Sequence, residues 1–158
     1  MREMKAAELM TPDPIIVERG TPISDVAREF REHDIGMVPV VESHADRRLL
    51  GVITDRDVAV RCVAAGHEPH HCSVDQHMTR DVRAVRAGDD VATVMAVMKS
   101  AQVRRVPVLD AKDRVIGIIA QADLAVEAVE EQAVSKLDVA DTVARISEPA
   151  HPEKKSVH

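Results

Sequence analysis

The chain contains an internal repeat, and this repeat restricts the folds that it can adopt. A shift of 68 positions places the Met-Thr pair at 10–11 on the pair at 78–79. After a two-residue insertion in the first copy, the shift becomes 66. The other aligned pairs are Gly20 with Gly88, Ile35 with Val103, Val38 with Val106, Pro39 with Pro107, Gly51 with Gly117, Ile53 with Ile119 and Asp57 with Asp123. Such a coherent series indicates a duplication.

Each copy predicts an extended piece followed by a helix. The extended pieces fall at 15–17 and 81–85, and apolar residues then recur at helical spacing. In the first copy we expect Thr21 to cap the helix with Pro22 at its first position. In the second copy Asp89 is the expected cap.

Two strands and a second helix complete each copy. The runs MVPVV, LLGVIT, RVPVLD and VIGIIA are rich in β-branched residues, which is typical of strands buried on both faces. Second helices are expected at about 56–65 and 121–132. The β-α-β-β-α order predicts an α/β (α+β) fold with small sheets covered by helices. Two copies packed together bury far more surface than one copy of about 65 residues.

The composition limits the partners of the chain. One Phe and no Trp or Tyr leave an aliphatic core, in which Met95 and Met98 are expected as filler. The same lack of rings removes base-stacking surfaces, and a formal net charge of −6 argues against nucleic-acid binding. No signal region or membrane-length apolar run is evident, so we expect no membrane association and a cytoplasmic location with free thiols at Cys62 and Cys72.

These patterns suggest five segments along the chain. The first copy is expected at 6–66 and the second at 76–132, joined by a linker at 67–75. A last amphipathic stretch at 133–146 predicts one more helix, and a polar tail at 147–158 is expected to be flexible.

The ordered motifs resemble the CBS domain family, in its usual tandem pair. They are the Met-Thr pair, the apolar-Pro-Val element at 37–40 and 105–108, and the Gly-x-x-Thr-x-x-Asp ending at 51–57. The chain is most similar to short stand-alone bacterial members, including the hypoxic response protein type. The resemblance implies two β-α-β-β-α repeats packed around a pseudo-twofold axis, with two clefts between the sheets. It also implies a homodimer of such pairs.

The resemblance implies a first nucleotide site in one cleft. In members that bind nucleotides, the closing Asp accepts hydrogen bonds from the ribose, the preceding Thr binds phosphate, and aliphatic residues hold the adenine. Free N–H groups of a helix that begins near Thr54, and the charge of Arg56, would favour phosphate. The expected set is Thr11, Pro14, Ile15, Ile16, Met37, Pro39, Thr54, Arg56 and Asp57. A plain helix cap also explains Thr54 and Asp57, so both interpretations stay open.

The second cleft departs from the family pattern. Ala120 replaces the Thr, and Gln121-Ala122 replaces the Asp-Arg pair. Arg104 and Arg105 could supply the missing charge, although a pair of solvated surface arginines is the interpretation that we favour. The weaker candidate set is Thr79, Asp81, Val82, Arg104, Arg105, Pro107, Ala120 and Asp123.

The linker region is rich in histidine, which the resemblance does not explain. Imidazole and thiolate are natural zinc ligands, and the candidates are His67, His70, His71, Cys72 and His77. Their spacing fits no closed zinc motif, and solvated loop histidines are the alternative. Cys62 falls within the expected second helix and is expected to be a small core residue.

The sequence therefore predicts a non-catalytic regulatory module that binds an adenine nucleotide or adenosyl ligand (AMP, ADP, ATP, S-adenosylmethionine or NAD). No Ser-His-Asp set, P-loop or dinucleotide fingerprint is evident in the sequence. No cofactor is obligatory on this interpretation. The alternative is a stand-alone stress-response protein, structural or metal-binding, whose nucleotide clefts are vestigial. A third interpretation is a cleft that serves as a surface for an unidentified protein partner.

Overall fold

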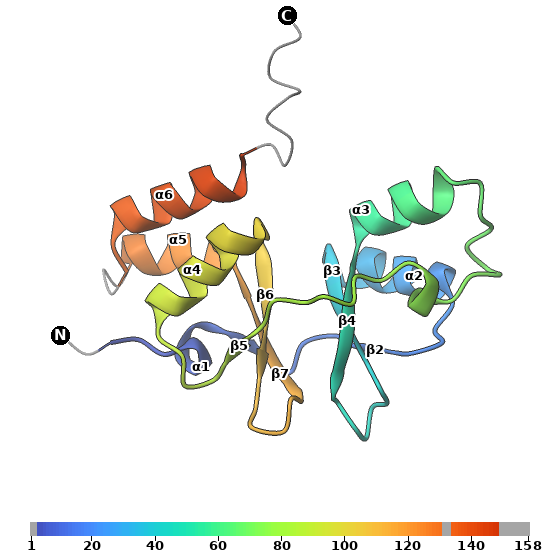
Figure 1. Cartoon of the computed structure of the whole chain (residues 1–158), viewed down its shortest axis with the longest axis horizontal. Helices are drawn as coiled ribbons and strands as arrows, with labels where there is room; N and C mark the ends of the chain where they lie inside the picture. The colour runs from blue at the N-terminus through green and yellow to red at the C-terminus, as the bar shows by residue number, and fades with distance from the viewer. Residues whose placement is uncertain (1–2, 131–133, 149–158) are drawn as a thin grey trace, which may run out of the picture.

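A computed structural model describes residues 3–130 and 134–148 of the chain, and Figure 1 shows its elements. The first half contains α1 Ala6–Leu9, β1 Thr11–Pro12, β2 Val17–Glu18, α2 Ile23–His33, β3 Met37–Val41, β4 Leu49–Thr54, α3 Asp55–Asp57 and the π-helix η1 Val58–Val63. The second half contains the 3₁₀-helix η2 Val74–Gln76, β5 Val85–Arg86, α4 Val91–Ala101, β6 Arg105–Leu109, β7 Val115–Ala120, α5 Gln121–Glu130 and α6 Lys136–Ile146. The expected helix end at 131–132 and nearly all of the expected tail, 149–158, lie outside the described residues.

Two small sheets face each other, each with its helices on the outer side (Figure 1). Their strand orders are β2-β3-β4 and β1-β7-β6-β5. β2 runs parallel to β3, and β5 runs parallel to β6. The pairs β3–β4 and β6–β7 are antiparallel. Both antiparallel pairs shift register at equivalent places, between Val40 and Val41 and between Val108 and Leu109. The shared irregularity confirms the duplication.

The first long helix of each copy, α2 and α4, begins one residue later than predicted. Pro22, not Thr21, is the N-cap of α2, because the Thr21 hydroxyl donates to the Glu18 carbonyl at 2.7 Å and closes the preceding turn. Asp90, not Asp89, caps α4, with its carboxylate accepting from the Thr93 N–H at 2.8 Å. The carboxylate of Asp89 is occupied in the turn before the helix, since it accepts from the N–H of Arg86 at 2.8 Å.

The second helices of the two copies differ. The sequence predicts a regular helix at about 56–65, but the structure has one turn of α3 and then the π-helix η1. In the second copy α5 is a regular α-helix at the equivalent place. A π-helix closes its turns between residues five apart, so its turns are wider and its side chains point in different directions.

Aliphatic side chains fill three clusters, as the composition predicts. One lies inside each copy, and Met95 and Met98 are buried in that of the second copy. The third joins the copies through Ile16, Val41, Leu109 and Val115. Backbone hydrogen bonds also connect the copies. The N–H of Leu49 donates to the Asp113 carbonyl, and the N–H of Val115 donates to the Arg47 carbonyl.

The Met-Thr elements are exchanged between the copies. β1, which carries Thr11, pairs with β7 of the second sheet, and Figure 1 shows α1 beside that sheet. In return, Thr79 forms an antiparallel bridge with Val52 of β4. Each sheet is thus completed by a segment from the other copy. No helix in the described parts of the chain has the length and apolar character needed to cross a membrane.

Candidate functional site

The motif that closes the first copy forms a reciprocal cap at the end of β4. The N–H of Thr54 donates to Asp57 Oδ2, and the N–H of Asp57 donates to Thr54 Oγ1, both at 3.0 Å. Asp57 Oδ1 has a looser partner, Arg61 Nε at 3.7 Å. Thr54 and Asp57 therefore do form a helix cap, as one of the two interpretations predicts. This cap leaves the Thr54 hydroxyl hydrogen and one Asp57 oxygen available to a ligand.

The backbone donors at this helix start are not free, so that part of the sequence-based expectation was wrong. The N–H of Asp55 donates to the Gly36 carbonyl at 3.0 Å, and that of Arg56 to Asp55 Oδ1 at 2.8 Å. Asp57 supplies the third donor, already used by Thr54. A phosphate here would depend on side chains, namely the Thr54 hydroxyl and the exposed Arg56 guanidinium.

The other residues predicted for the first site divide between two sheets. Met37 and Pro39 lie buried in β3, directly opposite Thr54 and Val52 of β4 in the strand register. Pro14 and Ile15 are partly buried, and Ile16 belongs to the cluster between the copies. Thr11 is exposed on the second sheet, whereas Thr79 lies against β4. The exchange of segments places Thr79, rather than Thr11, beside the strand that ends at Thr54.

The second copy retains half of the cap. The N–H of Ala120 donates to Asp123 Oδ2 at 2.8 Å, but Ala120 has no hydroxyl to complete the pair. Pro107 is buried, Val82 is partly buried, and Asp81 and Arg104 are exposed.

Arg105, predicted for the second site, reaches the first copy. A Cβ on Gly36 would lie 3.2 Å from Asp55 Oδ2 and 3.5 Å from Arg105 Nη1. The guanidinium of Arg105 therefore lies next to the helix start of the first copy.

The histidine-rich linker is only partly gathered by the fold. Cys62, Cys72 and His77 offer ligand atoms that all lie within 4.8 Å of one another. His67 stands against His77, with 3.5 Å between His67 Nδ1 and His77 Nε2. His70 and His71 are exposed and do not belong to this group.

Cys62 is the residue that the sequence interpretation missed. It is buried, as predicted, but it also faces Cys72 and His77. Burial and the neighbouring Cys72 raise the pKa of the Cys62 thiol. Burial, together with the charges of His67 and Arg61, lowers the pKa of His77, which favours the neutral imidazole.

The comparisons with known sequences agree with the fold. The CBS domain model matches twice, at residues 6–63 and 74–130. Hypoxic response protein 1 of Mycobacterium tuberculosis is 33% identical over 120 residues, which cover 76% of this chain and 82% of that protein. CBS domain-containing protein YhcV of Bacillus subtilis is 30% identical over 119 residues, covering 75% and 81%.

Solved structures show the same architecture. The crystal structure of Hypoxic Response Protein I with two coordinated zinc ions has a TM-score of 0.71 at 32% identity, covering 77% of this chain and 97% of that one. The CBS domain pair of protein MJ0100, in complex with 5′-methylthioadenosine and S-adenosyl-L-methionine, has a TM-score of 0.68 at 26% identity, covering 78% and 94%. With two family matches, a duplicated fold and the exchanged Met-Thr segments, the chain belongs to the CBS domain family and is a tandem CBS pair.

Proposed function

We propose that this CBS pair is a non-catalytic regulatory module that binds an adenine nucleotide or adenosyl ligand between its two copies. The observation that carries the proposal is the complete Thr54-Asp55-Arg56-Asp57 motif at the end of β4. The Thr54 and Asp57 side chains are each held by the backbone N–H of the other residue, and each can still form a further hydrogen bond. A preorganised site of this kind loses little conformational entropy when a ligand binds.

The chemistry of the motif suits a ribose phosphate. Asp57 Oδ1 can accept from a ribose hydroxyl, because its present partner is a half-exposed arginine at 3.7 Å. The Thr54 hydroxyl can donate to a phosphate oxygen while still accepting from the Asp57 N–H. Arg56 on the same turn and Arg105 from the second copy supply positive charge.

Related proteins support the ligand class. The MJ0100 pair carries two adenosyl compounds, and its likeness to this chain extends over most of both proteins. A ligand that contacts both copies would favour one relative arrangement of the two sheets, and a partner protein could detect that arrangement. This is the regulatory role that we assign to the module.

We also propose a homodimer formed through the second helices of both copies. Four valines on these helices are strongly exposed, at 51% for Val60, 58% for Val63, 53% for Val126 and 65% for Val129. They occupy equivalent positions under the shift of 66, so both copies present the same apolar pair. Exposed apolar side chains at matched positions are typical of an association surface.

Calorimetric titration tests the nucleotide proposal directly. Protein stripped of small molecules would be titrated with AMP, ADP, ATP, S-adenosylmethionine, 5′-methylthioadenosine and NAD. We expect at least one adenosyl ligand to bind and to raise the melting temperature, followed by circular dichroism because the chain has no Trp or Tyr. A ligand at 100 times its Kd raises the melting temperature by roughly 5–10 °C in a chain of this size. No response to any of the six would favour the alternative of vestigial clefts.

A further inference from the structure

Three soft donor side chains converge where the first copy passes into the second. Cys62 comes from η1, Cys72 from the linker, and His77 follows η2. Cys62 is fully buried, and His77 is only 6% exposed. We propose that Cys62, Cys72 and His77, with His67 as the fourth ligand, bind one Zn²⁺ ion. This site is separate from the nucleotide cleft and does not depend on the nucleotide proposal.

The distances within the group suit a tetrahedral ion. Zinc bonds of about 2.0–2.1 Å to nitrogen and 2.3 Å to sulfur place neighbouring ligand atoms roughly 3.3–3.8 Å apart. The facing nitrogens of His67 and His77 already lie 3.5 Å apart. The ligand atoms of Cys62, Cys72 and His77 need to close from within 4.8 Å by about 1 Å, a movement that side-chain rotation supplies.

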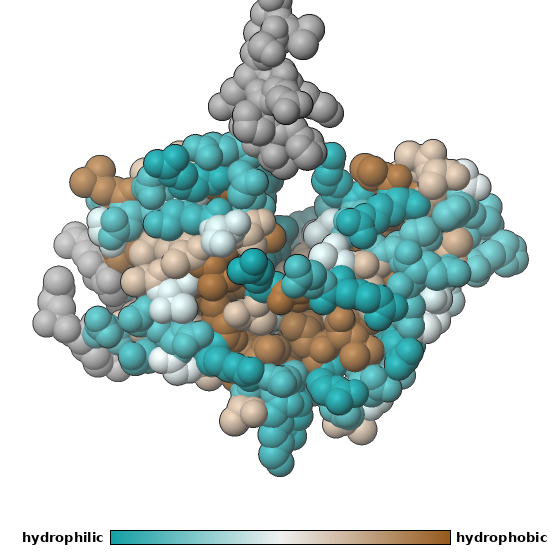
Figure 2. All heavy atoms as spheres, in the orientation of Figure 1, coloured by the Kyte–Doolittle hydropathy of each residue, from teal (hydrophilic) through white to brown (hydrophobic). Residues whose placement is uncertain are grey.

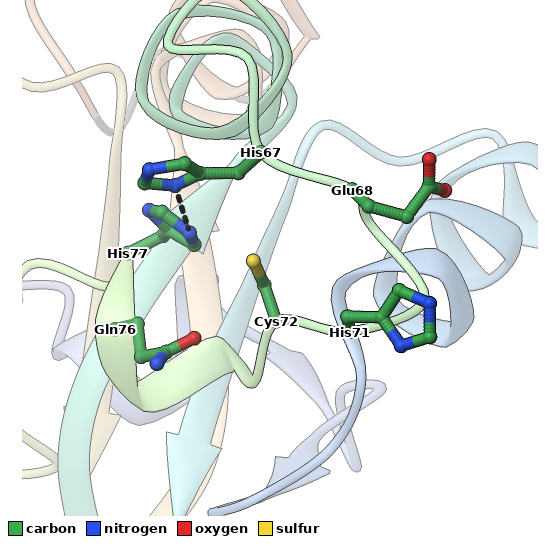
Figure 3. Close-up of a pocket in the computed structure, with 6 residues that line it drawn as sticks. All are labelled: His67, Glu68, His71, Cys72, Gln76 and His77. Atoms are coloured by element: carbon green, nitrogen blue, oxygen red, sulfur yellow. Dashed lines mark hydrogen bonds between the residues drawn. The ribbon is translucent and has the colours of Figure 1, made fainter.

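The side chains also point in the required directions. Figure 3 shows the Cys72 sulfur directed toward the paired rings of His67 and His77, whereas His71 and Glu68 point away. These residues line a cavity of about 340 Å³. Two thiolates and two imidazoles form a closed structural zinc set, and this soft donor set excludes Mg²⁺ or Ca²⁺ as the preferred ion.

The internal repeat shows that the fold itself does not require these polar groups. Under the shift of 66, Cys62 corresponds to Ala128, which is buried in the second core. Under the shift of 68, His77 corresponds to Leu9, which packs against the same core. The first copy therefore carries a thiol and an imidazole at two positions where the second cluster uses apolar residues. Burying polar groups costs free energy, which ligation of a metal would offset.

The C-terminal end of the second helix of the first copy brings two of the ligands together. The N–H of His67 donates to the Cys62 carbonyl at 3.0 Å, and the N–H of Gly66 donates to the Val63 carbonyl at 3.1 Å. With the positive φ of Gly66, these two bonds form the Schellman ending of a helix. The Cys62 thiol also donates to the His67 carbonyl at 3.8 Å. In the second copy, where Ala128 replaces Cys62, the helix is regular. The π-helix η1, which precedes this ending and carries Cys62, does depart from α-helical geometry, and such departures are frequent at functional sites.

Zinc content and cobalt spectroscopy test the proposal. The full chain would be purified with a phosphine reductant, stripped with a chelator and dialysed against zinc. We expect one zinc per chain by elemental analysis and a higher melting temperature with zinc. We also expect the intense charge-transfer and visible bands of tetrahedral thiolate-bound cobalt after Co²⁺ is added.

Matched variants identify the ligands. Cys62→Ala and His77→Leu introduce the residues found at the equivalent positions of the other copy, so both should fold, as circular dichroism would show. We expect each to abolish the cobalt bands and the zinc-dependent rise in melting temperature. Cys72→Ser, at a partly buried position, should do the same, and His67→Ala should weaken zinc binding at least tenfold. The double variant His70→Ala, His71→Ala should bind zinc like the parent.

The opposite pattern would overturn the site. Zinc retained in Cys62→Ala but lost in the His70→Ala, His71→Ala variant would place the metal on the exposed loop. No zinc-dependent response in the parent, or a Cys62–Cys72 disulfide that the phosphine fails to reduce, would also contradict it. Calorimetry with AMP on the zinc-free parent separates this outcome from that of the nucleotide proposal.

Discussion

Met78 packs directly over Gly51, so the Met-Thr element of the second copy lies against the sheet of the first. A Cβ added to Gly51 would lie 2.6 Å from the Thr79 carbonyl oxygen and 2.9 Å from the Met78 sulfur. In the second sheet, a Cβ added to Gly117 would likewise meet the side chain of Met10 from the first copy. The glycine of each closing motif is therefore required by the segment that crosses from the other copy.

Gly51→Ala should consequently destabilise the pair. The new methyl group meets backbone that is itself hydrogen-bonded to Val52, so it cannot be relieved by rotating a side chain. We expect a loss of about 1–3 kcal/mol in the free energy of unfolding, measured by urea denaturation. Gly88→Ala is the control, because nothing lies within 4 Å of its Cβ position, and its effect should stay within about 0.5 kcal/mol. Equal stability of the two variants would contradict the packing described.

Asp57→Asn should reduce nucleotide binding more than it reduces stability. An amide keeps an oxygen for the Thr54 N–H but loses the charge that accepts from ribose. A hydrogen bond to a charged group contributes about 1.5–3 kcal/mol, so we expect roughly 10- to 100-fold weaker binding of the best adenosyl ligand by calorimetry.

Asp123→Asn is the matched control for this change. Asp123 accepts from the Ala120 N–H at 2.8 Å, so its replacement perturbs a helix start in the same way. Its ligand affinity should stay within about threefold of the parent, a difference of less than 1 kcal/mol. Equal losses of affinity in the two variants would mean that Asp57 acts only as a cap.

The sequence predicted the parts of the structure that depend on local pattern. The duplication, the order of elements, the aliphatic clusters and the buried Met95 and Met98 all follow from periodicity and composition. The exchange of the Met-Thr segments could not be predicted, because an alignment of copies does not show which sheet a two-residue strand joins. Each predicted cap was wrong by one position, since Thr21 and Asp89 are equally good at closing the preceding turn.

The place of Cys62 in the candidate metal site was the least predictable feature. The apolar spacing around Cys62 is that of an ordinary core helix, and burial confirmed that interpretation. Its proximity to Cys72 and His77 depends on the path of the linker, which brings these two residues back to Cys62. The spacing of histidines and cysteines does not indicate that path. The sequence had already named His67, Cys72 and His77 as candidates, and for Cys62 the one clue was its comparison with Ala128 across the repeat.

The charge of Asp90 should make the stability of the pair sensitive to acid. Hydrogen bonds from the backbone and hydroxyl of Thr93 lower the pKa of Asp90 below its ordinary value of 3.8. A carboxyl with a lowered pKa stabilises the fold above its ordinary pKa, and this contribution is lost as pH falls through the pKa of the folded state. Asp90→Asn keeps a capping oxygen without the charge. We expect the parent to have the higher urea midpoint at pH 6, and the difference to shrink at pH 3.

Replacing the exposed valines should test the dimer. Val63→Glu combined with Val129→Glu places a charge on the second helix of each copy, and desolvating it at an apolar interface is costly. Light scattering coupled to gel filtration should change from the mass of two chains to the mass of one. Leu137→Glu is the control, because Leu137 is 82% exposed but lies on α6, outside the proposed surface. A parent that is already monomeric would rule the dimer out.

Ala120→Thr should give the second copy the reciprocal cap that Thr54 and Asp57 form in the first copy. The N–H of Ala120 already donates to Asp123, so a threonine hydroxyl would complete the reciprocal cap and offer a donor for phosphate. We expect a gain of about 0.5–2 kcal/mol in the free energy of unfolding, and Thr54→Ala should lose a similar amount. Calorimetry should also show a second adenosyl site, or tighter binding at a weak one, in Ala120→Thr. If stability rises while the number of bound ligands does not change, the second cleft lacks more than a hydroxyl, and the missing Arg56 equivalent at Ala122 becomes the next position to replace.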